Sequence, residues 1–195
     1  MGKARIAFRF GHYGDCFHGS QVQPDVPTVQ GTFMHIFKKK LKWTQERMPV
    51  AFSSRTDSGV HVRLNGGFID LEQERWDAMG EAGFVKAVGH QIPESISLVD
   101  ARQVADEWSP RRALYRTYRY RMECMEGWVE PELEDFNELC SLFKGEHDWS
   151  NFCRREPGRT TTRVVEECRP WVNDGRIIGF EIVGEAFVWN QVRRI

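Results

Sequence analysis

The sequence has no apolar run long enough to cross a bilayer and no excess of charge of either sign. The segment Met1 to Arg5 is not followed by the apolar stretch that a secretory signal requires. With 27 basic and 28 acidic residues the net charge is −1, which neither favours nor excludes a nucleic-acid partner, because a local basic face would be enough. We therefore expect a cytoplasmic protein without a membrane partner.

Cysteine and histidine are placed too sparsely to predict a metal site. The 5 cysteines are an odd number without a C-x-x-C pair, so neither a zinc knuckle nor a disulfide framework is expected. None of the 6 histidines pairs with another at the spacing of metal ligands on a helix. Free thiols in a reducing compartment are the simpler interpretation, and no metal is expected.

Charge is segregated along the chain. Arginines gather at Arg111, Arg112, Arg116, Arg119 and Arg121, and again at Arg154, Arg155, Arg159 and Arg163. Acidic residues are concentrated between Glu126 and Glu138. Such segregation would give one face that can meet phosphates. The hydrophobic content of 41% is enough to build a buried core.

The first half of the chain alternates strand and helix patterns. Apolar residues at every second position from Ile6 to Phe10 predict a half-buried strand. Thr28 can cap a helix whose apolar face runs from Val29 to Leu41. Further strands are predicted at 50–53, 68–71 and 96–104, and a second helix at 76–88.

The second half begins with the same order of elements. A strand is predicted around Arg116–Met122, a helix from near Pro131, and two strands at 161–172 and 176–189 joined by a hairpin turn. The sequence thus predicts an α+β fold of two ferredoxin-like (RRM-like) halves that share a central mixed, mainly antiparallel sheet. We expect the halves to be residues 1–105 and 106–195.

The segment Arg55–His61, with the sequence Arg-Thr-Asp-Ser-Gly-Val-His, has two interpretations. Ser, Asp and Gly favour a turn for backbone reasons, and composition alone favours this interpretation. However, Asp57 lies between Arg55 and His61 on a loop after a strand, which is where catalytic groups are usually displayed.

Two other segments also have both a structural and a functional interpretation. Arg116–Arg121 alternates basic and aromatic residues, which suits an ordinary strand or a surface where rings stack on bases and guanidinium groups meet phosphates. Phe187–Ile195 reads as a strand passing into a helix with a basic, solvated turn. A functional interpretation of that segment needs a partner carboxylate for Arg193.

Together these segments resemble the TruA-type tRNA pseudouridine synthases. Residues 55–61 resemble the R-T-D-x-G-V-H motif that carries the family's catalytic aspartate. Arg116-Thr117-Tyr118 resembles its basic-x-Tyr motif, and Phe187–Ile195 resembles F-x-x-x-x-V-R-x-I. Further matches lie at 19–21, 23–31 and 143–149, so the resemblance covers nearly the whole chain in the family's order.

The resemblance implies an isomerase that converts uridine to pseudouridine in the anticodon stem-loop of tRNA, at nucleotides 38 to 40, without a cofactor. Asp57 would be the catalytic carboxylate, acting by covalent attack or by deprotonating the sugar. Tyr118 would stack on the flipped uracil, and Arg55 would support the gap left in the RNA. Arg193 would be the cation that keeps Asp57 ionised. The further arginines expected to contact RNA are Arg116 and Arg119.

The resemblance also implies a homodimer whose two subunits both contact the RNA. Family members continue past the V-R-x-I segment, so the second half is expected to lack its C-terminal helical region. Two alternatives stay open: a related pseudouridine synthase that acts on other RNA uridines, and a non-catalytic RNA-binding module. A hydrolase using Asp57 and His61 is disfavoured, because no oxyanion-hole or nucleophile-elbow pattern accompanies them.

Overall fold

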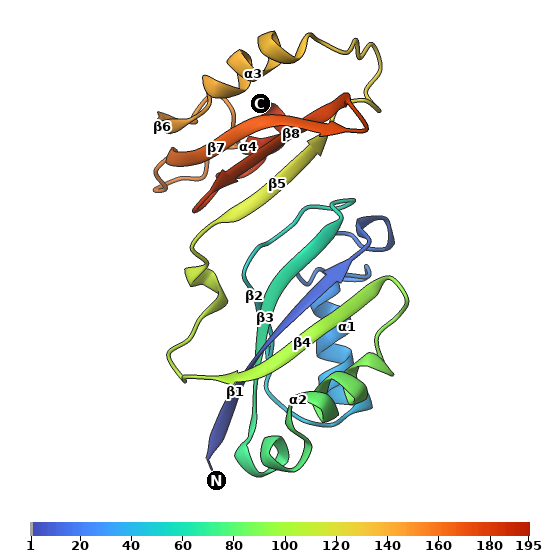
Figure 1. Cartoon of the computed structure of the whole chain (residues 1–195). Coiled ribbons are helices and arrows are strands. Elements are labelled where there is room, and N and C mark those ends of the chain that lie inside the picture. The colour runs from blue at the N-terminus through green and yellow to red at the C-terminus, as the bar shows by residue number, and fades with distance from the viewer. Residues whose placement is uncertain (1) are drawn as a thin grey trace. The chain divides into compact units, whose positions relative to one another are not determined.

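The computed structural model describes residues 2–195, and the chain divides into a unit that ends at Arg112 and a second unit from Ala113 to Ile195 (Figure 1). Each unit contains one four-stranded sheet, with strand order β2-β3-β1-β4 in unit 1 and β5-β8-β7-β6 in unit 2. Every pair of neighbouring strands is antiparallel. The predicted α+β class is confirmed, and within each unit the sheet is wholly antiparallel.

Unit 1 follows the order of elements that the sequence predicts. Its strands are β1 (Lys3–His12), β2 (Ala51–Phe52), β3 (Val62–Glu72) and β4 (Ile96–Val104). Its helices are α1 (Val29–His35), the π-helical continuation η2 (Ile36–Lys40), and α2 (Gln73–Gly89), with 3-10 turns η1 (Gly14–Cys16) and η3 (Pro110–Arg112). Strand β3 begins six residues before the predicted 68–71 segment, because Arg63 and Asn65 hide its pattern.

Local sequence explains where the helices of unit 1 begin and bend. The Thr28 hydroxyl accepts a hydrogen bond from the Gly31 amide at 3.2 Å, which is the N-cap expected from the sequence. In α2 the backbone of Gly80 leaves the helical region, with φ +56° and ψ −167°, so the helix is kinked there. Glycine tolerates this conformation because it has no Cβ. No helix within residues 2–195 is long and apolar enough to span a membrane.

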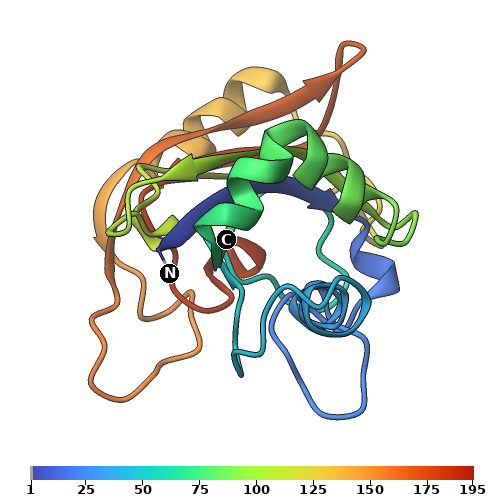
Figure 2. The same ribbon diagram turned by 90° about the horizontal axis from the view of Figure 1, so that it is seen from below.

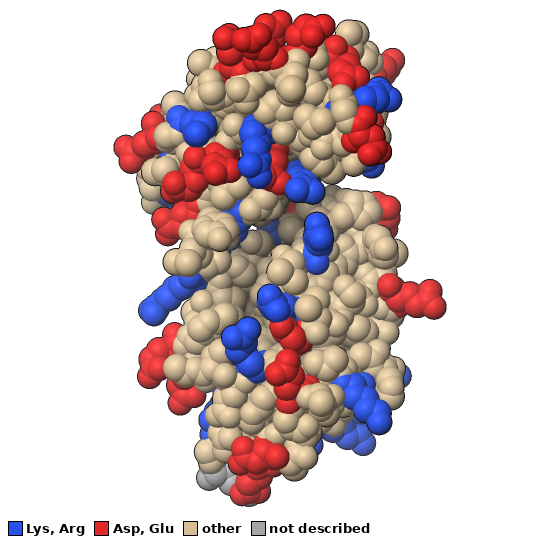
Figure 3. All heavy atoms as spheres, viewed as in Figure 1, with Lys and Arg blue, Asp and Glu red and all other residues tan. Residues whose placement is uncertain are grey.

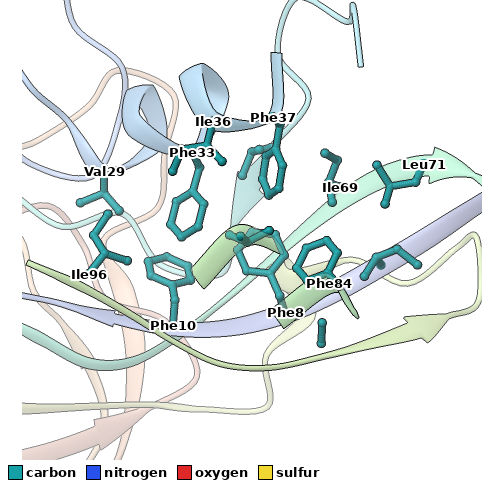
Figure 4. Close-up of a cluster of buried hydrophobic side chains, with 14 of the residues drawn as sticks. Phe8, Phe10, Val29, Phe33, Ile36, Phe37, Ile69, Leu71, Phe84 and Ile96 are labelled. Carbon is teal, nitrogen blue, oxygen red and sulfur yellow. The ribbon is translucent and has the colours of Figure 1, made fainter. Parts of the chain in front are cut away.

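The core of unit 1 is built from aromatic rings on one face of β1. The Phe8 ring centroid lies 5.2 Å from that of Phe33 in α1 and 6.0 Å from that of Phe84 in α2, so one strand residue contacts both helices (Figure 4). Phe10 packs against Phe33 at 5.0 Å between ring centroids. Each of these four rings is at most 1% exposed. Burying a ring of this size stabilises a fold by about 2–3 kcal/mol.

Unit 2 has a smaller core under its own helix. Its strands are β5 (Arg116–Arg121), β6 (Gly145–Asp148), β7 (Thr162–Asn173) and β8 (Arg176–Gly184), and its helices are α3 (Leu133–Ser141) and α4 (Gln191–Arg194). Phe136 and Cys140 of α3 are buried with Cys168 of β7 and Ile182 of β8. The predicted hairpin at 173–175 is confirmed, whereas β8 ends at Gly184 and not near Trp189, and β6 was not predicted.

The opposite face of the unit 2 sheet is held together by charge. The Glu181 carboxylate on β8 accepts hydrogen bonds from Arg119 Nε on β5 at 2.7 Å and from Arg169 Nε on β7 at 3.0 Å. Burial acts to raise the pKa of Glu181, but the hydrogen bonds and charges of the two arginines outweigh it and hold that pKa below its usual value. Acidic side chains gather instead over α3, at Glu134, Asp135 and Glu138 (Figure 3).

Candidate active-site loop

Asp57 lies on the loop between β2 and β3, and its side chain is exposed in the structure. The loop makes a turn in which the Val60 amide donates to the Asp57 carbonyl at 3.4 Å, and Gly59 adopts φ +78°. The segment is therefore a turn, as its composition predicts, and the Asp57 carboxylate lies at its surface. We call residues 53–61 the Asp57 loop.

Ser20, on the loop between β1 and α1, binds the residue that precedes Asp57. The Ser20 hydroxyl accepts from the Thr56 amide at 2.8 Å, and the Ser20 amide donates to the Thr56 carbonyl at 3.0 Å. The Ser20 carbonyl in turn accepts from the amide of Gln30 in α1 at 2.9 Å. Figure 2 shows α1 nearly end-on, with the loop that precedes it extending beyond the helix. Asp57 is thus tied through Ser20 to the start of a helix.

Asn65, on β3, holds the other end of the same loop. Its side-chain oxygen accepts from the amides of Ser54 at 3.2 Å and Gly66 at 2.9 Å, and its nitrogen donates to the Ser54 carbonyl at 3.0 Å. Asn65 is 6% exposed, so water cannot easily replace these bonds. The amide therefore fixes the direction in which the chain leaves β2.

A third contact comes from Gly14 at the start of η1, just after β1. A Cβ on Gly14 would lie against the backbone of Gly59 and Val60, so only glycine allows the two loops to approach this closely. The Gly14 amide donates to His61 Nδ1 at 3.3 Å. Burial lowers the pKa of His12, the nearby His61 charge lowers it further, and a hydrogen bond to the Val60 backbone opposes both.

These contacts make the Asp57 loop a rigid display of one carboxylate. Of the residues expected in the site, Arg55 and Asp57 share this loop and both are exposed. Neither Asn65 nor His12 was predicted to take part. Asn65 gave no usable signal, because the predicted strand began only at residue 68 and left Asn65 outside it. His12 gave no local signal, since its contacts are tertiary.

The remaining predicted site residues lie in unit 2. Tyr118 is on the packed face of β5, where its ring meets that of Phe187 edge-on at 5.2 Å between centroids. Arg193 lies in the short helix α4 and is exposed. Asn190, just before α4, adopts the left-handed conformation with φ +65°, which Asn accommodates better than most residues. This turn directs the chain from the Phe187 segment into α4.

Two arginines expected to contact RNA have partners within the protein. Arg119 Nε is paired with the buried Glu181 carboxylate at 2.7 Å, and an Arg116 side-chain nitrogen donates to the Glu185 carbonyl. Because Glu181 offsets part of its charge, Arg119 offers less attraction to a phosphate than the sequence pattern indicates. The alternating strand is therefore explained largely by packing on one face and ion pairing on the other.

Comparison with known proteins identifies the family of the chain. The model of a tRNA pseudouridine synthase family matches residues 139–195. A protein of Thermococcus kodakarensis named tRNA pseudouridine synthase A is 31% identical over 194 residues, covering 98% of this chain and 68% of its own length. The chain belongs to the tRNA pseudouridine synthase A family. A protein of the same name from Methanoculleus marisnigri is 32% identical, covering 96% of this chain and 65% of its own length.

Family membership confirms the resemblance found in the sequence. A third member, from Archaeoglobus fulgidus, is 32% identical, and the match covers 98% of this chain and 66% of the relative. The chain thus spans 65% to 68% of the length of these relatives. The roles of Asp57, Tyr118 and Arg193 are not part of these matches and are taken up as proposals.

Proposed function

We propose that this family member is a tRNA pseudouridine synthase whose catalytic carboxylate is Asp57. The observation that carries the proposal is the Asp57 loop itself, an exposed acid held from three sides by Ser20, Asn65 and Gly14. A loop fixed in this way suits a group that must meet one atom of a bound substrate, because small displacements of a catalytic group are costly. The relatives are named for tRNA, and we extend that substrate to this chain.

The reaction is an isomerisation that balances without an added reactant. The C1′–N1 bond of uridine breaks, the uracil turns, a C5–C1′ bond forms, and the proton on C5 is lost while N1 gains one. Asp57 begins it by attacking C1′ or by removing a sugar proton. We propose that Tyr118 stacks on the uracil and that Arg55 occupies the gap that the flipped base leaves. We also propose that Arg193 supplies a positive charge that stabilises the Asp57 carboxylate.

The proposed target is the anticodon stem-loop, at nucleotides 38 to 40. Uridines at the end of a stem are less costly to flip than those within a long duplex, since flipping costs a few kcal/mol and least where pairing is weak. The proposed assembly is a homodimer with RNA contacting both subunits. Light scattering of the protein with and without tRNA would measure that stoichiometry.

The test uses an unmodified tRNA transcript tritiated at uracil C5. The protein should release tritium without a cofactor, and mapping should place pseudouridine at 38 to 40. Asp57→Asn should reduce release below detection while RNA binding persists, because the side chain keeps its shape and loses only its charge and nucleophile.

The matched control is Asp174→Asn, which makes the same chemical change in the hairpin between β7 and β8. Asp174 has φ +49°, a conformation that Asn also adopts readily, so the fold should be preserved. Full activity of Asp57→Asn would overturn the proposed mechanism. Pseudouridine at other positions would support the proposed reaction and contradict the proposed target nucleotides.

A further inference from the structure

The loop between β6 and β7, residues 149–161, extends away from the strands that it joins (Figure 2, orange). It carries Arg154, Arg155 and Arg159 with one acid, Glu156, and all three arginines are exposed. We call it the arginine loop. A long loop with several cations would usually be mobile, so its attachment decides whether the charges have a fixed position.

The base of the arginine loop is fixed at both ends. Asp148 accepts from the Ser150 amide at 3.0 Å and from the Thr161 hydroxyl, which lowers the pKa of Asp148. The Trp149 amide donates to the Thr161 carbonyl at 3.1 Å, and its ring, 2% exposed, fills the core. Cys153 is buried as well. The loop therefore leaves the sheet from a rigid, closed base.

The arginine loop is also attached to the C-terminal segment of unit 2. The Arg154 amide donates to the Trp189 carbonyl at 2.9 Å, and Arg194 Nη1 donates to the Cys153 carbonyl at 3.0 Å. The Arg154 guanidinium lies over the Trp189 ring, 4.3 Å from its centroid. The ring itself is 43% exposed. Stacking holds the planar guanidinium in place with its N–H groups at the surface, so little side-chain entropy is lost when it binds an anion.

In the part of the chain that the structure describes, two arginines of the arginine loop lack the carboxylate partner that the arginines of the unit 2 sheet have in Glu181. Among residues 2–195, Glu156 pairs with Arg159 at 2.9 Å, whereas no carboxylate is within ion-pair distance of Arg154 or Arg155. Arg155 acts only weakly on Asp148, as the smallest of the influences on its pKa. On the sheet, by contrast, the arginines that flank Glu181 share its carboxylate. A polyanion would therefore be attracted to the arginine loop more strongly than to the strand arginines.

We propose that the arginine loop, together with the Trp189 ring on which Arg154 stacks, binds the phosphate backbone of the RNA substrate. An exposed aromatic ring beside unpaired guanidinium groups is the combination that suits nucleic acid, where phosphates meet the arginines and a base or ribose packs against the ring. The inference rests on the proposed function for the identity of the RNA. The arginine loop then helps to bind the RNA substrate and takes no part in breaking or forming the glycosidic bond.

The experiment measures binding and turnover separately on the full chain. The dissociation constant of a fluorescein-labelled, unmodified tRNA transcript is determined by anisotropy over a range of salt concentrations. For the double variant Arg154→Ala with Arg155→Ala, the slope of log K against log salt should become shallower by about 1.4–1.8, because each lost phosphate contact contributes roughly 0.7–0.9. The KM of pseudouridine formation should rise with the dissociation constant, and kcat at saturating RNA should stay unchanged.

The matched control removes two other exposed arginines of unit 2, Arg121→Ala with Arg176→Ala. They are paired with Glu123 at 2.7 Å and Glu130 at 3.2 Å. Removing them changes the net charge of the protein as much as the loop double variant does, and it leaves the arginine loop intact. This control should keep the salt slope of the unchanged protein. Arg154→Lys, which keeps the charge and loses the planar stacking, should keep the slope and weaken binding only a few-fold.

The outcomes separate this inference from the proposed function. An unchanged salt slope in the loop double variant overturns the inference even if the protein makes pseudouridine. A fall in kcat without a rise in KM also overturns it, because the loop would then act only by holding the Trp189–Arg194 segment. Loss of self-association with RNA binding intact assigns the surface to a protein partner and overturns it too. A shallower slope in a protein that forms no pseudouridine supports the inference and overturns the proposed function.

Discussion

Replacing Asn65 with alanine tests whether the Asp57 loop is held as described. The substitution removes three hydrogen bonds, those to the Ser54 amide, the Ser54 carbonyl and the Gly66 amide. A typical hydrogen bond contributes about 0.5–1.5 kcal/mol net. Ser54 is half-buried, so water can satisfy part of what is lost. We therefore expect a cost of about 2–3 kcal/mol, below the sum of three full bonds.

Amide hydrogen exchange measures this cost at the position where it arises. A loss of about 2–3 kcal/mol corresponds to exchange at Ser54 and Gly66 that is roughly 30- to 150-fold faster. Pseudouridine formation should fall as well, although Asn65 is not proposed to touch RNA. The control Asn173→Ala changes an exposed hairpin residue and should alter neither quantity. Exchange at Ser54 that stays within a factor of two would refute the anchoring role of Asn65.

Three further predictions concern residues around the loop and the sheet. Because burial lowers the pKa of His12, the unfolded chain binds this proton at higher pH than the folded chain does. The free energy of unfolding should therefore fall as pH drops below about 6.5. Urea midpoints between pH 5 and 8 should show this fall, and His12→Gln should flatten the dependence. Gly14→Ala should cost about 1–3 kcal/mol in unfolding free energy and reduce turnover, because its Cβ meets the Val60 backbone; wild-type turnover would contradict the close approach of the two loops. Glu181→Gln should lower the unfolding free energy by about 1–3 kcal/mol, since two guanidinium groups then lose their shared counter-charge, whereas Glu185→Gln at an exposed position should have no measurable effect.

Much of the fold could be predicted because its signals are local. Thr28 predicts the start of a helix, the alternation from Ile6 to Phe10 predicts β1, and the turn residues at 173–175 predict a hairpin. The errors lie where tertiary contacts override the pattern. Strand β3 begins among polar residues that pair with β1, and the short strand β6 is defined only by its hydrogen bonds to β7.

The sequence indicates the chemistry proposed for the site but not the contacts that hold the Asp57 loop. The resemblance selects Asp57 because the acid and its neighbours form one contiguous motif. Asn65 binds Ser54, just before that motif, and His12 binds the Val60 backbone within it, and no spacing in the sequence reveals either pairing. For Arg119, alternation on β5 shows that it faces outward, but only the register with β8 brings it opposite Glu181. Whether a basic residue is available to an RNA depends on such neighbours.

The separate core of unit 1 has a consequence for the protein while it is being made. All residues of that core lie between Ala4 and Ala101. The contacts that hold the Asp57 loop, through Gly14, Ser20 and Asn65, lie within the same stretch. Domains generally fold as units in the order of their synthesis. The Asp57 loop can therefore take its final form on the ribosome before the C-terminal segment that carries Arg193 has been translated.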